Sequence, residues 1–398
     1  MIVVYASSHG WGHNIRVLSI LNELYNYPLE IVTTAPDYLI YSSLQKKRSK
    51  PLTIRHLKTD PGCVQSDPFT IDVEKTVAAW EETIANEDKL LEEEIKILQP
   101  KQVRLVISDI SYFGQLVAEK LNVPSICIST FDWAFILKDY IKEHPGLAKA
   151  IDHVQEISAR FDHCIIPGSV CKPLNIGKKQ VNFHWTCRKP LMSKTEMRQK
   201  LGLLLHHDSV LLTFGGHSIM KLPQSVWQTF ENFQFFVLVP DGEFHQPPAD
   251  NVHLLSSAEW SKYHVDLVNT VDIVFGKLGY GLVSEALLCK TTVLCVERKG
   301  NPEGQILRDQ LRIVVPYEEI TEEQFLNGEW HALNRLVEIY RTNEEYSDIP
   351  VDGEIQAAKY IRDVLGDKEP LNINVDMKKL AILVLLVSVL FYFFFLRK

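Results

Sequence analysis

The sequence lacks the features that mark a secreted or a nucleic-acid-binding protein. Its seven cysteines form no Cys-x-x-Cys pair, and no Asn-x-Ser/Thr acceptor occurs in the 398 residues. This pattern fits neither a disulfide framework nor a zinc site and favours a reducing compartment. The net charge of −8 and the lack of a basic stripe argue against a nucleic-acid partner. The chain opens directly on a strand-like stretch at 2–6, so we expect no signal peptide.

Long apolar runs are also missing, with one exception near the C-terminus. Residues 380–396 are 17 consecutive uncharged residues, almost all Leu, Val, Ile and Phe, between two pairs of basic residues. At about 1.5 Å per residue, a helix of this length spans roughly 25 Å, the short end of the range for a bilayer. We therefore expect a C-terminal transmembrane anchor that inserts after synthesis and leaves residues 1–379 in the cytosol.

The rest of the chain has the composition of a soluble α/β protein and the length of two domains. It is 46% hydrophobic and 23% charged, and 398 residues exceed what one core usually holds. Short apolar stretches alternate with helical ones in both halves, at 2–6, 29–33, 103–109 and 125–129, and again at 209–214, 235–240, 271–275 and 292–297. This alternation predicts two doubly wound parallel sheets.

Proline content and helix signals set the predicted domain boundaries. They are 1–166 for an N-terminal Rossmann-like domain, 167–192 for a linker, 193–350 for a second Rossmann-like domain, 351–366 for a closing helix, 367–379 for a polar tether and 380–396 for the anchor. The second domain is expected to open with a capping box, Ser193-Lys-Thr-Glu196, and a short helix.

The most informative stretch is a glycine turn that follows the strand-like residues 271–275 and leads into a helical pattern. Free backbone N–H groups at a helix start form an anion site, and Gly279 and Gly281 allow the backbone to approach a ligand closely. Lys277 adds a positive charge. Glu285, one turn into the helix, can accept two hydrogen bonds from a vicinal diol such as ribose.

An anion site and a diol site in one turn together indicate a nucleotide. The simpler interpretation is an ordinary glycine turn with Lys277 and Glu285 in solvent, and the residue pattern leaves it open.

A second polar cluster is predicted at the carboxyl edge of the first sheet. His9 and His13 lie in a Gly-rich loop after the first strand, and Asp109 ends the strand at 103–109. Because ligands of doubly wound sheets gather at this edge, we expect His13 to act as a base that Asp109 orients. Arg16 is expected to pair with a carboxylate. The alternative is that Asp109 only caps its own loop.

Two motifs resemble those of GT-B glycosyltransferases. GWGHNIR (10–16) resembles the Gly-His loop of that superfamily, and KLGYGLVSE (277–285) matches in length the donor turn of UDP-sugar transferases. VISDISYFG, SICISTFDWAFI, LLTFGGHS, FGKLGYGLVSEAL and GEIQAAKYI resemble segments of the glycosyltransferase-like N-terminal half of the L-arabinokinase family. The likeness covers roughly residues 1–366.

This resemblance implies a GT-B fold, α/β with two Rossmann-like domains facing a cleft, followed here by one C-terminal transmembrane helix. It implies a metal-independent, inverting glycosyltransferase with a UDP-sugar as donor substrate and no cofactor. His13 and Asp109 match the catalytic base and its orienting Asp. The implied donor-binding residues are Gly215, Gly216, His217, Lys277, Gly279, Tyr280, Gly281 and Glu285, with Asn301 and Glu303 facing the donor sugar.

The sequence also departs from these families. Lys277 replaces the phosphate-binding His of plant secondary-metabolite transferases, and Pro302 falls where those enzymes carry a sugar-reading Gln. The galactokinase-like domain of L-arabinokinase has no counterpart, so sugar kinase activity is not expected. The acceptor is not identified, although an anchor points to a lipid-linked or membrane-protein acceptor.

Two alternatives to an enzyme of this kind remain. One is a non-catalytic nucleotide-sugar-binding or scaffold protein that keeps the fold. The other is a flavin- or NAD-type oxidoreductase. The second is weak, because the first turn reads Ser-Ser-His-Gly-Trp-Gly instead of Gly-x-Gly-x-x-Gly and no acidic residue ends the second strand.

Overall fold

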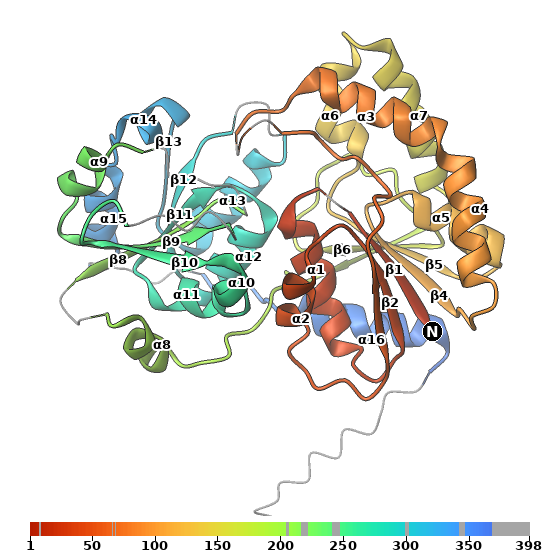
Figure 1. Cartoon of the computed structure of the whole chain (residues 1–398), viewed down its shortest axis with the longest axis horizontal. Helices are drawn as coiled ribbons and strands as arrows, with labels where there is room; N and C mark the ends of the chain where they lie inside the picture. The colour runs from red at the N-terminus through yellow and green to blue at the C-terminus, as the bar shows by residue number, and fades with distance from the viewer. Residues whose placement is uncertain are drawn as a thin grey trace, which may run out of the picture. The chain divides into compact units, whose positions relative to one another are not determined.

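A computed structural model describes residues 1–7, 9–65, 67, 69–203, 207–215, 222–240, 247–298, 302–341 and 347–367. It contains two parallel β-sheets with helices on their faces (Figure 1). Both sheets belong to one compact unit, residues 1–358, and residues 359–398 form a second unit.

The first sheet has seven parallel strands in the order β3-β2-β1-β4-β5-β6-β7. Their bounds are β1 Ile2–Ala6, β2 Leu29–Val32, β3 Leu52–Arg55, β4 Leu105–Asp109, β5 Ser125–Ile128, β6 His163–Pro167 and β7 Lys179–Phe183. Every residue of β1 and β4 is buried, as expected for central strands covered on both faces. The strand order reverses between β1 and β4, which is where open α/β sheets bind ligands.

Seven helices accompany this sheet in the described residues. They are α1 Gly10–Glu23, α2 Asp37–Ser43, α3 Val73–Ala85, α4 Glu87–Leu98, α5 Phe113–Leu121, α6 Trp133–Ile141 and α7 Pro145–Ser158. Helices α3, α6 and α7 share a core with the end of β4, in which Trp80 and Trp133 are almost fully buried. This core lies beneath the carboxyl edge of the sheet.

The second sheet repeats the doubly wound order with six parallel strands, β10-β9-β8-β11-β12-β13 (Figure 1). Their bounds are β8 Asp208–Thr213, β9 Phe233–Val239, β10 Val252–Ser256, β11 Ile273–Lys277, β12 Thr292–Val296 and β13 Tyr317–Ile320. The order reverses between β8 and β11, whose ends meet in the register pair Thr213 and Gly276. This second reversal point is therefore formed by Thr213, Gly276 and the residues that follow them.

The helices of the second half are α8 Lys194–Leu201, α9 Gln224–Thr229, α10 Ser257–Trp260, the 3-10 turn η1 Ser261–Tyr263, α11 His264–Thr270, α12 Tyr280–Cys289, α13 Gly304–Val314, α14 Glu322–Asn327, α15 Ala332–Arg341 and α16 Gly353–Leu365. The predicted capping box is present: the Ser193 hydroxyl accepts the N–H of Glu196, whose carboxylate bonds back.

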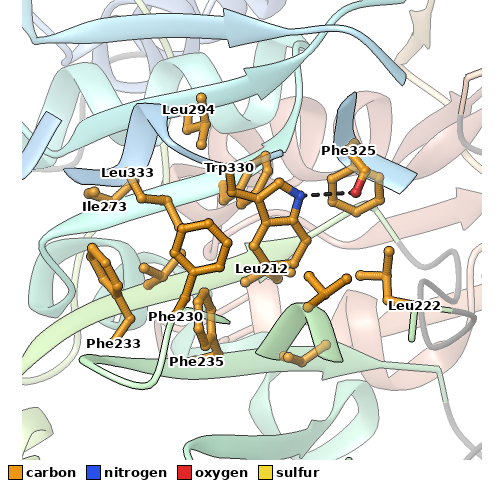
Figure 2. Close-up of a cluster of buried hydrophobic side chains, with 14 of the residues drawn as sticks. Leu212, Leu222, Phe230, Phe233, Phe235, Ile273, Leu294, Phe325, Trp330 and Leu333 are labelled. Atoms are coloured by element: carbon orange, nitrogen blue, oxygen red, sulfur yellow. Dashed lines mark hydrogen bonds between the residues drawn. The ribbon is translucent and has the colours of Figure 1, made fainter. Parts of the chain in front are cut away.

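One face of the second sheet rests on an unusually aromatic core (Figure 2). Trp330 is fully buried at its centre, and its indole N–H donates to the carbonyl of Phe325 at 3.0 Å. Phe275 of β11 packs edge-on against Trp330, with ring centroids 5.3 Å apart. Because Phe275 lies two residues before Lys277, this core fixes the end of the strand that delivers Lys277 to the site.

Three sequence predictions differ from the structure. The predicted linker, 167–192, contains β7, which pairs with β6 and completes the first sheet. Helix α1 begins at Gly10, not at Asn14, so its first turn includes the residues predicted to form a loop. The polar pattern of residues 71–99 predicts one long helix, but the structure has two, which meet at Asn86; its side-chain amide donates to the carbonyl of Glu82 at 2.9 Å, at the end of α3.

None of the helices among the described residues, which end at 367, is both long and apolar enough to cross a bilayer. The predicted transmembrane segment, 380–396, lies outside the described residues.

Candidate active site

A single cleft is lined by the carboxyl ends of both sheets. It includes the start of α1 with His13 and Arg16, and the turn from β11 to α12 with Lys277 and Glu285. One half of the lining is apolar and aromatic, with Trp11, Leu39, Phe131, Trp133 and Ile136. The other half is polar and comes from the second sheet.

His13 lies in the first turn of α1, not on a loop as expected. Its Nδ1 is 3.2 Å from Oδ1 of Asp109, the last residue of β4. Asp109 is fully buried, whereas the His13 side chain is 11% exposed and lines the cleft. If Nδ1 carries the proton that bonds to Asp109, the other ring nitrogen, Nε2, presents a lone pair to a substrate.

Arg16 pairs with Asp109, as the sequence suggested, but it does so on the same oxygen as His13. Its Nη2 also lies 3.3 Å from His13 Nδ1, and its Nη1 donates to Thr130 Oγ1 at 3.2 Å. Among the described residues, the second Asp109 oxygen has no hydrogen-bond partner. Two donors therefore compete for one carboxylate oxygen in a buried site, which the sequence did not predict.

His9, the N-cap residue of α1, is held as a neutral ring. Its Nδ1 accepts the backbone N–H of Cys63 at 3.3 Å, so Nε2 must carry the proton. Burial, with positive groups at His13 and Arg298, lowers the pKa of His9 well below its usual value. The ring sits over Gly62, where φ is +60° and a Cβ would lie 2.4 Å from that of His9. His9 is therefore a hydrogen-bond donor to the cleft and not a base.

Lys277 provides a buried cation without an acidic partner. It is the last residue of β11, and no carboxylate in the described residues forms an ion pair with it. Burial and the nearby Arg298 lower the pKa of Lys277 to about 7. Gly215, with φ +67°, lies under it: a Cβ there would be 3.4 Å from Lys277 Cε. An anion bound here would offset the positive charges of Lys277 and Arg298 and would favour the protonated form of Lys277.

The helical spacing of residues 283–288 predicts only the later part of α12, which begins at Tyr280 with Gly279 as its N-cap. A methyl group on Gly279 would meet nothing within 4 Å, so the space beside this helix start is open to a ligand. Gly281 is different: a methyl group there would lie 3.6 Å from the Cα of Gly12 in α1. Gly281 thus permits the two helix starts to approach one another, whatever it does for a ligand.

The Tyr280 side chain has partners from other parts of the chain. Its ring stacks on Trp185 at 4.9 Å, and its hydroxyl accepts the N–H of Thr186 at 3.2 Å. The Arg16 guanidinium lies over the same ring, 5.2 Å from its centroid. Tyr280 therefore joins the two halves of the molecule.

Glu285 is 2% exposed, and both of its oxygens already have partners. Oε1 accepts from Arg188 Nη2 at 3.1 Å, and Oε2 accepts from His264 Nδ1. Burial alone would raise the pKa of Glu285, but His264 and Arg188 outweigh it and hold that pKa below its usual value. Arg188, His264 and Thr213 were missed from the sequence. The sequence analysis expected Glu285 to face a ligand or solvent, so it gave no signal for such partners.

Glu303 comes from the start of α13 and reaches the His13 cluster. Burial raises its pKa, against the opposing effects of Arg16, His13 and Arg298 and of a hydrogen bond with Thr130. Gly216, His217 and Asn301, also predicted to bind the donor, lie outside the described residues. No group of three or more His, Cys, Asp or Glu side chains in the described part of the chain is arranged to hold a metal ion.

Solved structures with this arrangement are glycosyltransferases, and the fold of the chain is GT-B. Arabidopsis thaliana UGT89C1 complexed with UDP aligns with a TM-score of 0.57 at 13% identity, over 92% of this chain and 99% of its own. The calicheamicin glycosyltransferase CalG4 gives 0.57 at 14%, over 93% and 99%. Spinosyn rhamnosyltransferase SpnG complexed with thymidine diphosphate gives 0.52 at 11%, over 92% and 96%.

In sequence, the chain is similar to the L-arabinokinase of Arabidopsis thaliana. The two are 28% identical over 337 residues, which are 82% of this chain and 31% of that protein. The chain thus spans about a third of the length of this relative. No protein-family model matches the chain.

Proposed function

We propose that the protein is a glycosyltransferase that moves a hexosyl-type sugar from a UDP-sugar to a hydroxyl acceptor, with inversion and without a metal ion. One observation carries this proposal: His13, which is paired with the buried Asp109, and Lys277, which has no carboxylate partner among the described residues and precedes helix α12, line the same cleft. The first suits proton removal from an acceptor and the second suits a diphosphate. The complexes with UDP and thymidine diphosphate among the similar folds support a nucleotide donor.

In this mechanism, His13 Nε2 takes the proton of the acceptor hydroxyl as its oxygen attacks the anomeric carbon. Asp109 holds His13 through Nδ1 and stabilises the imidazolium that forms. The electron pair of the breaking bond goes to the leaving diphosphate. Lys277, Arg298 and the N–H groups at the start of α12 stabilise that negative charge.

The acceptor half of the cleft is apolar, with Phe131 and Trp133 beside His13 at ring-centroid distances of 5.6 and 6.3 Å. An acceptor with an apolar body and one reactive hydroxyl fits such walls. Together with a C-terminal anchor at 380–396, they favour a lipid-linked acceptor at a membrane surface.

The anchor can be tested directly. Removing residues 377–398 is expected to convert a membrane-bound protein into a soluble one, because 380–396 is the sequence's only long apolar run. Carbonate extraction of membranes that express either form is the measurement. Carbonate-resistant association of the shortened chain contradicts the anchor, and so would a full chain that is freely soluble.

A second function is favoured by one observation. Because Arg16 bonds to the same Asp109 oxygen as His13 and so shares the charge of that carboxylate, the protein is also suited to bind a nucleotide sugar without turning it over. It would then serve as a binding or scaffold protein with a GT-B fold.

The deciding experiment measures UDP binding and UDP release on the full chain. A panel of UDP-hexoses is incubated with and without lipid acceptors, in the presence of EDTA, with His13→Ala as the matched control. Release that requires His13 supports the transferase. Binding of UDP with no release from any donor supports the scaffold, and no binding of UDP rejects both.

A further inference from the structure

Behind the phosphate site, three side chains form a continuous hydrogen-bonded chain. Thr213 Oγ1, at the end of β8, is 3.0 Å from His264 Nε2. His264 Nδ1 donates to Glu285 Oε2. The other Glu285 oxygen accepts from Arg188, whose Nη1 donates to the Ser261 carbonyl at 2.9 Å. All of these residues line the cleft.

The carboxylate fixes the protonation of one imidazole nitrogen. Glu285 has its pKa held below the usual value, so it accepts only, and His264 Nδ1 must carry a proton. The direction of the hydrogen bond between His264 Nε2 and the Thr213 hydroxyl is not fixed in this way. Either Thr213 donates to a neutral ring, or a protonated ring donates to Thr213 and the hydroxyl hydrogen is free to point elsewhere.

Thr213 is also placed next to the expected phosphates. In the sheet it pairs with Gly276, the residue before Lys277. Two residues further along the chain, Gly215 lies under the Lys277 side chain. A phosphate held by Lys277 and the start of α12 would therefore lie close to the Thr213 hydroxyl.

We propose that Thr213, His264 and Glu285 form a proton relay to the donor diphosphate, in which Thr213 donates a hydrogen bond to a phosphate oxygen. The inference rests on the proposed nucleotide donor. A phosphate that takes the Thr213 hydrogen leaves His264 Nε2 without its donor, so binding draws a proton from solvent onto Nε2. Glu285, which Arg188 holds through its other oxygen, then stabilises the imidazolium beside a doubly charged anion.

In the transfer step the relay moves protons in one direction. The bond from the anomeric carbon to the β-phosphate oxygen breaks, and its electron pair stays on the diphosphate. The Thr213 proton passes to a diphosphate oxygen, and the His264 Nε2 proton passes to Thr213 Oγ1. His264 ends as a neutral ring that still donates from Nδ1 to Glu285. Glu285 and His264 are positioning residues for Thr213.

The other ionisable groups around His264, apart from Lys277, are not expected to take up a proton when UDP binds. The Cys187 and Cys289 thiols both have pKa values raised by burial and so stay protonated. Asp266, on the same helix as His264, accepts the N–H groups of Leu191 and Met192 at 2.7 and 2.6 Å. Lys277 is the exception, because a bound anion also favours its protonation.

The test separates the relay from Lys277. Calorimetric titration of full-length protein with UDP, near pH 7.5 in two buffers of different ionisation enthalpy, gives the number of protons taken up. The background is Lys277→Arg, which keeps a cation and removes the titrating amine. In this Lys277→Arg background, Thr213→Val is expected to abolish the remaining proton uptake on UDP binding, and Thr213→Ser is expected to retain it. His264→Gln is expected to behave like Thr213→Val.

In turnover, Thr213→Val is expected to lower kcat about 10–100-fold, because diphosphate is already a fair leaving group, and to weaken UDP binding about tenfold through the lost hydrogen bond to a charged group. UDP binding with equal uptake in the Val and Ser variants overturns the relay alone. So does a Lys277→Arg protein that binds UDP without uptake. If no form binds UDP, the proposed donor site fails and the relay fails with it.

Discussion

The two halves of the cleft contain the same trio of groups in different arrangements. In the first half Asp109 is shared by His13 and Arg16, and in the second Glu285 is shared by His264 and Arg188. In the second trio, histidine and arginine each have their own oxygen. In the first they share one oxygen, and the other has no partner among the described residues.

In the Glu285 trio both carboxylate oxygens have hydrogen-bond partners, whereas in the Asp109 trio only one oxygen has partners among the described residues. The Glu285 trio is closed by Thr213 on the far side of its histidine, so each group has a hydrogen-bond partner before any ligand arrives. The Asp109 trio can change: His13 can move its bond to the free oxygen and leave the first to Arg16. A catalytic base needs that freedom, because its charge changes during the reaction.

The largest expected effect comes from removing His13, the proposed catalytic base of the first trio. His13→Ala is expected to lower turnover at saturating donor about 10²–10⁴-fold, because it removes the proposed base that takes the acceptor proton, with UDP affinity unchanged. His9→Ala is the control and should cost much less, since His9 is a neutral donor. Steady-state kinetics beside calorimetry decide it. Wild-type turnover by His13→Ala would make the base assignment wrong.

The next effect concerns stability and compares the two arginines. Arg16→Met is expected to lower the free energy of unfolding by about 3–5 kcal/mol, because it leaves a buried carboxylate. Arg188→Met should cost less, since Glu285 keeps His264 on its other oxygen. Urea denaturation is the measurement. Arg160→Met, which breaks a surface pair 40% exposed, is the control and should cost about 0–1 kcal/mol. Equal losses for Arg16 and Arg188 would remove the distinction between the trios.

A smaller effect tests what Glu285 does. Glu285→Ala is expected to weaken UDP binding by about 1.5–3 kcal/mol if the carboxylate holds the ribose through charged hydrogen bonds. In that case 2′-deoxy-UDP, which lacks one hydroxyl, should lose less. If Glu285 acts through His264 and Thr213 instead, both nucleotides should weaken alike. Calorimetry with the two ligands separates these roles, and unchanged affinity for both would reject each of them.

The smallest effect is a pH dependence of UDP binding. Burial and Arg298 lower the pKa of Lys277 to about 7, so the amine loses its charge as pH rises through 7. A bound anion favours the charged form, and affinity should therefore fall between pH 6.5 and 8.5, by at most about tenfold per pH unit. Lys277→Arg should flatten most of this slope. A wild-type affinity that rises with pH would contradict the assignment.

Local patterns were sufficient to predict the sheets and the first site. Apolar runs with glycine turns gave the central strands, and the doubly wound rule then brought His13 and Asp109 to one edge from 96 residues apart. The edge strand β7 was missed because its residues alternate exposed and half-buried, which gives no apolar run. Helix α1 was placed too late because Gly10 and Gly12 are poor helix formers that tertiary packing overrides.

The partners of Glu285 were not predictable in the same way. Arg188 lies 97 residues before it, in a stretch expected to be a linker, and no periodic pattern points from one to the other. His264 starts a short helix whose position depends on how η1 and α11 pack. Such contacts follow from the packing of irregular segments, about which residue spacing carries no information.

The contact between Gly12 and Gly281 has a consequence for how a ligand acts on the whole molecule. Each glycine lies in the first turn of its helix, so α1 and α12 bring their positive ends together. Two like poles at this distance repel, and Lys277, which also lines the cleft, adds to the repulsion when it is protonated. An anion bound between the two helix starts attracts both of them, so the net interaction across this contact becomes attractive. A bound nucleotide is therefore expected to hold the two halves shut, and its departure to let them part.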